Sequence, residues 1–98
     1  MNSHGSMPGW MKQTKAASHM REILAERGFD IPSRRMTLGD NQQWVVFERG
    51  DHQVGIDPAT GIWLRESGGE WRCVGTVYST SGAFMAVDFL IGDKSQLK

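Results

Sequence analysis

The chain has 98 residues, which is enough for one domain with a modest core and too few for two such domains. Its 11 basic and 11 acidic residues balance, so it lacks the strong overall charge that draws a protein to nucleic acid or to an anionic membrane. A single cysteine, Cys73, excludes an internal disulfide and a cysteine-built zinc site, and it favours a reducing, cytoplasmic location. No stretch approaches the ~20 apolar residues that a membrane-spanning helix needs.

Residues 1–7, with the sequence MNSHGSM, are expected to be a cloning remnant or a disordered N-terminus, which leaves one domain over residues 8–98. From Pro8 to Gly28, apolar residues recur at helical spacing and charged residues fill the other side. This pattern predicts an amphipathic helix. Gly28 is expected to end it in a left-handed conformation, with Phe29 folding back on the last turn.

A connector follows over residues 31–41, after Pro32 has prevented the helix from resuming. Met36 and Leu38 could form a short edge strand or simply anchor a loop, and we favour the loop.

From Gln42 onward the chain predicts strands separated by turns, with no room for a helical crossover and therefore an antiparallel meander. Turns at residues 50–51, 57–61 and 68–69 set the registers. The expected pairs are Arg49 with His52, Phe47 with Val54, Val45 with Ile56, Ile62 with Ile56, Leu64 with Val54, Leu64 with Cys73 and Trp63 with Val74.

The longest apolar run extends from Glu70 to Gly92 and predicts two strands folded about Ser81-Gly82. This register pairs Val77 with Ala86 and Cys73 with Leu90. The hairpin is apolar on both faces, so whichever face packs on the helix, the other face also needs cover.

The predicted fold is α+β, with an N-terminal amphipathic helix packed on a five-stranded antiparallel β-meander. The face assigned to the helix carries Val45, Phe47, Val54, Ile56, Ile62, Leu64, Trp71, Cys73, Val77, Phe84, Ala86 and Leu90. The opposite face carries Trp44, Val46, Trp63, Val74, Tyr78, Met85, Val87, Phe89 and Ile91. The two assignments could be inverted, in which case the helix covers the tryptophans.

The second face is too apolar to stay in contact with water. Three arrangements would cover it. Two copies could form a homodimer that sandwiches their sheets, the sheet could curl into a small barrel, or the face could be a groove for a ligand or partner segment. We favour the homodimer, because two-fold pairing is the commonest way for a small domain to hide a second face.

Catalytic, metal and cofactor signatures are absent from the sequence. Cys73 is expected to be a buried structural residue, since a reactive thiolate needs a basic neighbour and access. His19 and His52 lack metal-ligand spacing, and the glycines form neither a P-loop nor a dinucleotide fingerprint.

Asp88 is the most informative ionisable residue, because it lies within an otherwise apolar segment where a carboxylate is costly unless it is paired. The predicted register places it across from Gly75, which leaves space for another group or a ligand. The competing interpretation is a structural ion pair with an arginine or histidine of the helix or the connector.

The leading functional prediction is a non-enzymatic binding or interaction protein, homodimeric through its aromatic sheet face. Its predicted contact residues are Trp44, Trp63, Tyr78, Met85, Phe89 and Asp88. One alternative is a protein that binds a small apolar molecule or acts as an enzyme, with Asp88 in an apolar pocket. A second is nucleic-acid binding through a basic edge made by Lys12, Lys15, Arg21, Arg27 and Arg34. We disfavour it because acidic residues interrupt that edge.

Overall fold

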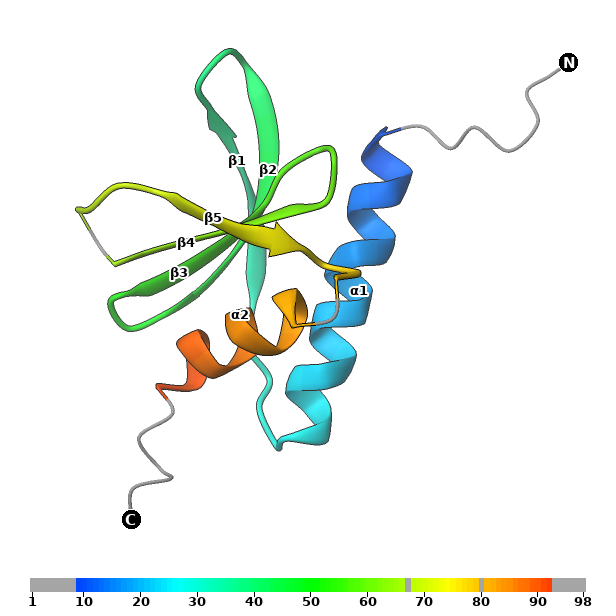
Figure 1. Cartoon of the computed structure of the whole chain (residues 1–98), viewed down its shortest axis with the longest axis vertical. Coiled ribbons are helices and arrows are strands. Elements are labelled where there is room, and N and C mark those ends of the chain that lie inside the picture. Colours follow the sequence, from blue (N-terminus) through cyan, green and yellow to red (C-terminus); the bar gives the residue numbers. More distant parts are fainter. Residues whose placement is uncertain (1–8, 67, 80, 93–98) are drawn as a thin grey trace, which may run out of the picture.

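The computed structural model describes residues 9–66, 68–79 and 81–92, so the predicted N-terminal remnant at residues 1–7 lies outside the described residues. The elements are α1 (Gly9–Glu26), β1 (Ser33–Leu38), β2 (Gln42–Arg49), β3 (His52–Ile56), β4 (Gly61–Glu66), β5 (Arg72–Thr76) and α2 (Gly82–Ile91). The strands form one antiparallel sheet in the order β1-β2-β3-β4-β5. Figure 1 labels the strands and the two helices. The predicted class, a helix packed on a five-stranded antiparallel meander, is confirmed, although two of its elements differ from those expected.

The first difference is β1, which occupies the connector for which a loop was favoured. This strand pairs with β2 along its whole length, from Ser33 opposite Phe47 to Leu38 opposite Gln42. Its residues are exposed or half-buried. Backbone hydrogen bonding to β2 therefore makes this strand, and a mostly polar edge strand gives little hydrophobic signal in a sequence.

The second difference is α2, which replaces the predicted last strand. Its buried residues include Ala83, Ala86, Val87 and Leu90, which follow helical spacing and lie against the sheet. In a segment that is apolar almost throughout, periods of 2 and 3.6 residues cannot be distinguished. Ser81-Gly82 therefore begins a helix instead of closing a hairpin, and the pairs predicted across that hairpin do not form.

Turn chemistry predicted the central registers correctly. Phe47 lies opposite Val54, Val54 opposite Leu64, and Ile56 opposite Ile62. The β4–β5 register was wrong by one residue, because an irregularity between Ile62 and Trp63 places Trp63 opposite Cys73. A shift of one residue moves side chains to the other face.

The β4–β5 shift and the helical structure of α2 place several side chains elsewhere than predicted. Cys73 is exposed instead of buried, and Phe84 is also exposed. Trp71 joins the tryptophans of the opposite face. Val87 is fully buried with the residues of the helix-covered face.

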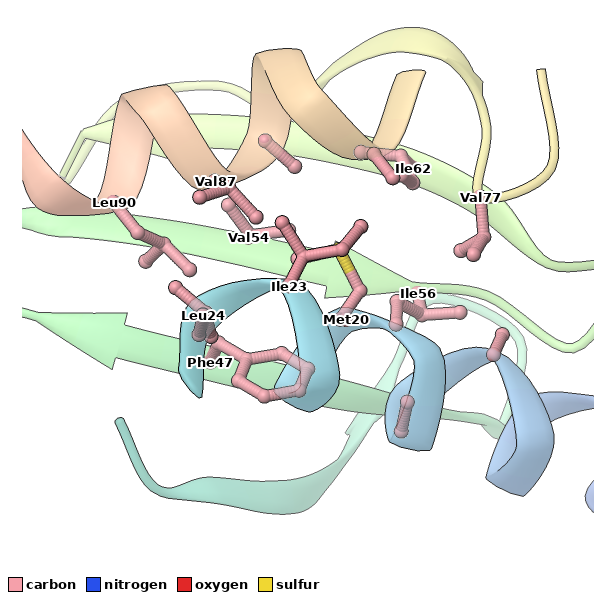
Figure 2. Packing of buried hydrophobic residues seen from close by; sticks show 14 of the residues in the cluster. Met20, Ile23, Leu24, Phe47, Val54, Ile56, Ile62, Val77, Val87 and Leu90 are labelled. Carbon is pink, nitrogen blue, oxygen red and sulfur yellow. The ribbon is translucent and has the colours of Figure 1, made fainter. Parts of the chain in front are cut away.

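Both helices pack on the same face of the sheet and enclose the core. Figure 2 shows Met20, Ile23 and Leu24 of α1 and Val87 and Leu90 of α2 around the strand residues. The core contains Ala16, Ala17, Met20, Ile23, Leu24, Ile31, Val45, Phe47, Val54, Ile56, Ile62, Leu64, Val77, Ala83, Ala86, Val87 and Leu90. The helix therefore covers the aliphatic face, which was the assignment favoured from the sequence.

The end of α1 is built as predicted. Gly28 has a left-handed φ of 83°, and its N–H donates to the Ala25 carbonyl over 2.9 Å. The N–H of Phe29 donates to the Leu24 carbonyl over 2.9 Å, which completes a Schellman motif. This turn sends the chain back toward β1.

Candidate interaction surfaces

The six predicted contact residues do not share one face. Trp44 and Trp63 lie on the outer face of the sheet, away from the helices, whereas Met85, Asp88 and Phe89 belong to α2 on the other side. Tyr78 lies in the turn before α2, where its ring stacks on His19 of α1 at 5.8 Å. The sequence placed them together because residues 83–91 were interpreted as a strand.

Three tryptophans cover the outer face of the sheet. The Trp44 ring lies 5.3 Å from both the Trp63 and the Trp71 rings, between centroids. Trp44 retains 9% of its exposure and Val46 none. Trp63 is anchored further by its indole N–H, which donates to Asp57 Oδ2 over 2.8 Å. A single chain therefore buries much of the face that was expected to need a partner.

A network of polar side chains lies beside the tryptophans on the outer face of the sheet. Arg34 pairs with Glu48 at 3.2 Å, and the amide of Gln53 donates to Glu48 over 3.1 Å. Arg65 donates to Gln53 over 2.5 Å, and its guanidinium lies 4.5 Å from the centroid of the Trp71 ring. These contacts link β1, β2, β3 and β4 to the aromatic cluster.

The tryptophan cover depends on the absence of a side chain at Gly55. A Cβ atom there would lie 2.6 Å from Trp44 Cε3 and 3.3 Å from Trp71 Cζ3. We expect Gly55→Val to lower the free energy of unfolding by about 1–3 kcal/mol, because the buried rings must shift. Chemical denaturation would measure this loss, and tryptophan emission should move to longer wavelength. Thr37→Val on the exposed edge strand is the control, and a Gly55→Val protein as stable as this control would contradict the described packing.

Three large apolar side chains are exposed among the described residues, Tyr78, Phe84 and Met85, and two of them lie on the outer side of α2. Phe84 is 49% exposed and Met85 44% exposed, although both belong to a helix with one charged residue in ten. A helix that is apolar on all sides is normally buried on all sides. The core covers one side of α2, and the other side faces solvent.

Asp88 lies on this open side and pairs at 2.5 Å with Arg27, the residue that follows α1. The Asp88 side chain is 46% exposed. Arg27 also lies 5.7 Å from the centroid of the Phe84 ring, so one arginine contacts both the carboxylate and the aromatic side chain. This contact corresponds to the competing interpretation of the sequence, an ion pair between Asp88 and an arginine of the segment predicted to be helical.

An open hollow of about 430 Å³ lies beside α2, between this helix and strands β3 and β4. It is lined by His52, Leu64, Glu66, Met85, Asp88, Phe89 and Gly92. The His52 ring contacts Phe89 edge to face at 4.6 Å between centroids. The hollow therefore joins apolar side chains to a carboxylate on α2 and another on β4, and it extends the open surface of the helix.

No family model matches the chain, and comparisons with curated proteins and with solved structures found no match. Within the described ranges, no helix is long and apolar enough to cross a membrane. In the same ranges, His, Cys, Asp and Glu side chains do not gather in groups of three that could hold a metal ion.

Proposed function

We propose that this protein is a non-enzymatic interaction protein that forms a homodimer through the outer side of α2. The observation that carries the proposal is the half-exposed pair Phe84 and Met85 on a helix whose ten residues include one charged side chain. Full burial of such a side chain contributes about 1.5–3 kcal/mol. A dimer contact that covers Phe84 and Met85 of both copies therefore gains several kilocalories per mole.

A second copy of the chain suits this surface because the surface is self-complementary. With the two-fold axis perpendicular to α2, the two α2 helices run antiparallel, and the apolar residues of one meet those of the other. Arg27 and Asp88 border the same patch and pair with each other within one chain, so neither presents an unpaired charge that opposes a second copy. The chain carries no net charge, so two copies do not repel each other at long range.

We place the contact at α2 and not at the tryptophan face because of how each surface is covered within one chain. Trp44 and Val46 are already buried there, whereas Phe84 and Met85 remain half exposed. A dimer contact over the tryptophan face would therefore bury less additional apolar surface than a contact over α2.

The test is the solution mass over a dilution series, measured by light scattering or sedimentation. We expect the wild-type chain to have about twice the monomer mass of 11.0 kDa and to dissociate on dilution. Met85→Glu should weaken the dimer by at least about 100-fold, because it buries a charge without a partner. Ser18→Glu places the same charge on exposed α1 and should leave the dimer unchanged.

Two results would overturn the proposal. A wild-type protein that stays monomeric at millimolar concentration would show that α2 does not mediate self-association. A dimer that is disrupted by Trp63→Glu but unaffected by Met85→Glu would place the contact on the tryptophan face. Far-UV circular dichroism of each variant would confirm that a loss of mass is not a loss of folding.

A further inference from the structure

A groove between α1 and β1 gathers three arginines. It shares no lining residue with the hollow beside α2. It has a volume of about 290 Å³ and is lined by Thr14, Ala17, Arg21, Ser33, Arg34, Arg35 and Val45. Among the described residues, neither an aspartate nor a glutamate lines this groove. The groove is therefore a local concentration of positive charge in a chain that has no net charge.

The pairing of β1 with β2 brings these arginines to α1. Arg35 lies opposite Val45 and Ser33 opposite Phe47, and both partners face the core beneath α1. Side chains alternate along a strand, so Arg34 belongs to the other face and borders the groove at its rim. The predicted basic edge contained Arg21 and Arg34 but not Arg35, and the pairing of β1 with β2 adds Arg35 to them.

Neutral partners hold two of the guanidinium groups. Arg21 Nη2 donates to Ser33 Oγ over 3.0 Å, and Arg35 Nη1 donates to Gln13 Oε1 over 3.3 Å. Hydrogen bonds to a hydroxyl and to an amide restrict the side chains without neutralising their charge. The bonds therefore orient two cations in advance of binding, which reduces the entropy lost when an anion binds.

Gln13 is itself fixed by the core. It is 2% exposed, and its amide nitrogen donates to the Gln43 and Ile56 carbonyls over 2.8 and 2.9 Å. Because both donors are used inside the protein, the amide oxygen is directed toward Arg35. A buried glutamine on α1 thus positions an arginine on β1.

Two carboxylates lie near the groove but outside its lining. Glu48 pairs with Arg34 at 3.2 Å on the other face of the sheet. Asp30 and Arg21 together line a neighbouring hollow. Arg34 is therefore shared with an acidic residue, whereas the hydrogen bonds of Arg21 and Arg35 described above go to neutral groups.

We propose that this groove binds a phosphate group. Guanidinium groups form paired hydrogen bonds with phosphate oxygens, and two or three of them can surround one such group. The Ser33 hydroxyl accepts from Arg21, so its own proton can be donated to a phosphate oxygen. The phosphate can be inorganic or can belong to a nucleotide, and the experiment distinguishes these sources.

The test is a titration of the full chain with inorganic phosphate and, separately, with adenosine monophosphate, followed by ¹H–¹⁵N spectra. Sodium chloride at equal ionic strength is the reference. We expect saturable shifts at Arg21, Ser33 and Arg35. Equal affinity for both ligands would identify the phosphate group alone as the ligand, and tighter binding of the nucleotide would identify a nucleotide site.

Variants decide whether the groove is responsible. Arg35→Gln and Arg21→Gln should each weaken binding by at least about ten-fold, because each removes a charge-assisted hydrogen bond. Arg35→Lys keeps the charge but loses the paired geometry, so it should weaken binding as well. Arg72→Gln, on exposed β5, is the matched control and should bind like the wild type.

Shifts no larger than those caused by sodium chloride would overturn the proposal, as would equal binding by Arg35→Gln and Arg72→Gln. The dispersed spectrum of each variant serves as the folding check, and Arg35→Lys provides the test if Arg35→Gln does not fold. Met85→Glu should still bind phosphate, so failure of the dimer and failure of this site are separate results.

Discussion

Phe47→Ala is expected to lower the free energy of unfolding by about 3–5 kcal/mol, the range for removing a buried aromatic side chain. Phe47 has no exposed surface and lies between α1 and the sheet, as Figure 2 shows. The Arg21 guanidinium, 5.8 Å from its ring centroid, would also lose an aromatic partner. Because most domains are stable by only about 5–15 kcal/mol, this single truncation removes a large share of the total.

Urea denaturation at one protein concentration would measure this effect, since dimerisation adds a concentration-dependent contribution to stability. Tyr78→Ala is the control, because Tyr78 is 60% exposed and its loss should cost less than about 1 kcal/mol. A Phe47→Ala protein that unfolds at the same urea concentration as Tyr78→Ala would contradict the described core.

Gly82→Ala is expected to destabilise the protein by about 3 kcal/mol, although it replaces a glycine by the best helix former. A Cβ atom at position 82 would lie 2.1 Å from the Thr76 carbonyl oxygen and 2.4 Å from Ser79 Oγ. Backbone atoms cannot move aside as a flexible side chain can. The start of α2 would therefore have to separate from the turn after β5.

Helix propensity alone predicts the opposite sign, a gain of about 0.8–1 kcal/mol for this substitution. Thermal or chemical unfolding of Gly82→Ala thus distinguishes local preference from tertiary packing. Ser81→Ala is the neighbouring control, because the Ser81 side chain makes no capping hydrogen bond and its loss should change stability by less than about 0.5 kcal/mol. A more stable Gly82→Ala protein would show that the turn does not approach α2 as described.

Local chemistry made several elements predictable. The amphipathic pattern of α1 and the glycine at its end specify a helix and its terminus without help from the rest of the chain. The Gly50-Asp51 turn and the DPATG turn at residues 57–61 specify the registers of β2, β3 and β4, because turn geometry sets which residues face each other. The aliphatic face of these strands follows directly.

The candidate sites depended on contacts between distant segments. Asp88 meets Arg27, which is 61 positions away, and Arg35 meets Gln13 across 22 positions. Neither pair leaves a spacing in the sequence that could reveal it. The exposure of Cys73 and the position of Trp71 depend on a register irregularity between Ile62 and Trp63. The turn residues of the sequence do not predict this irregularity.

The sequence by itself determined that an apolar surplus exists near the C-terminal end, since residues 83–91 contain one charged side chain whatever structure they form. Tertiary structure alone decided that this surplus forms a helix, because docking Ala83, Ala86, Val87 and Leu90 on the sheet selects the helical period. It also decided that β1 is a strand, because the hydrogen bonds that hold it come from β2 and not from its own residues.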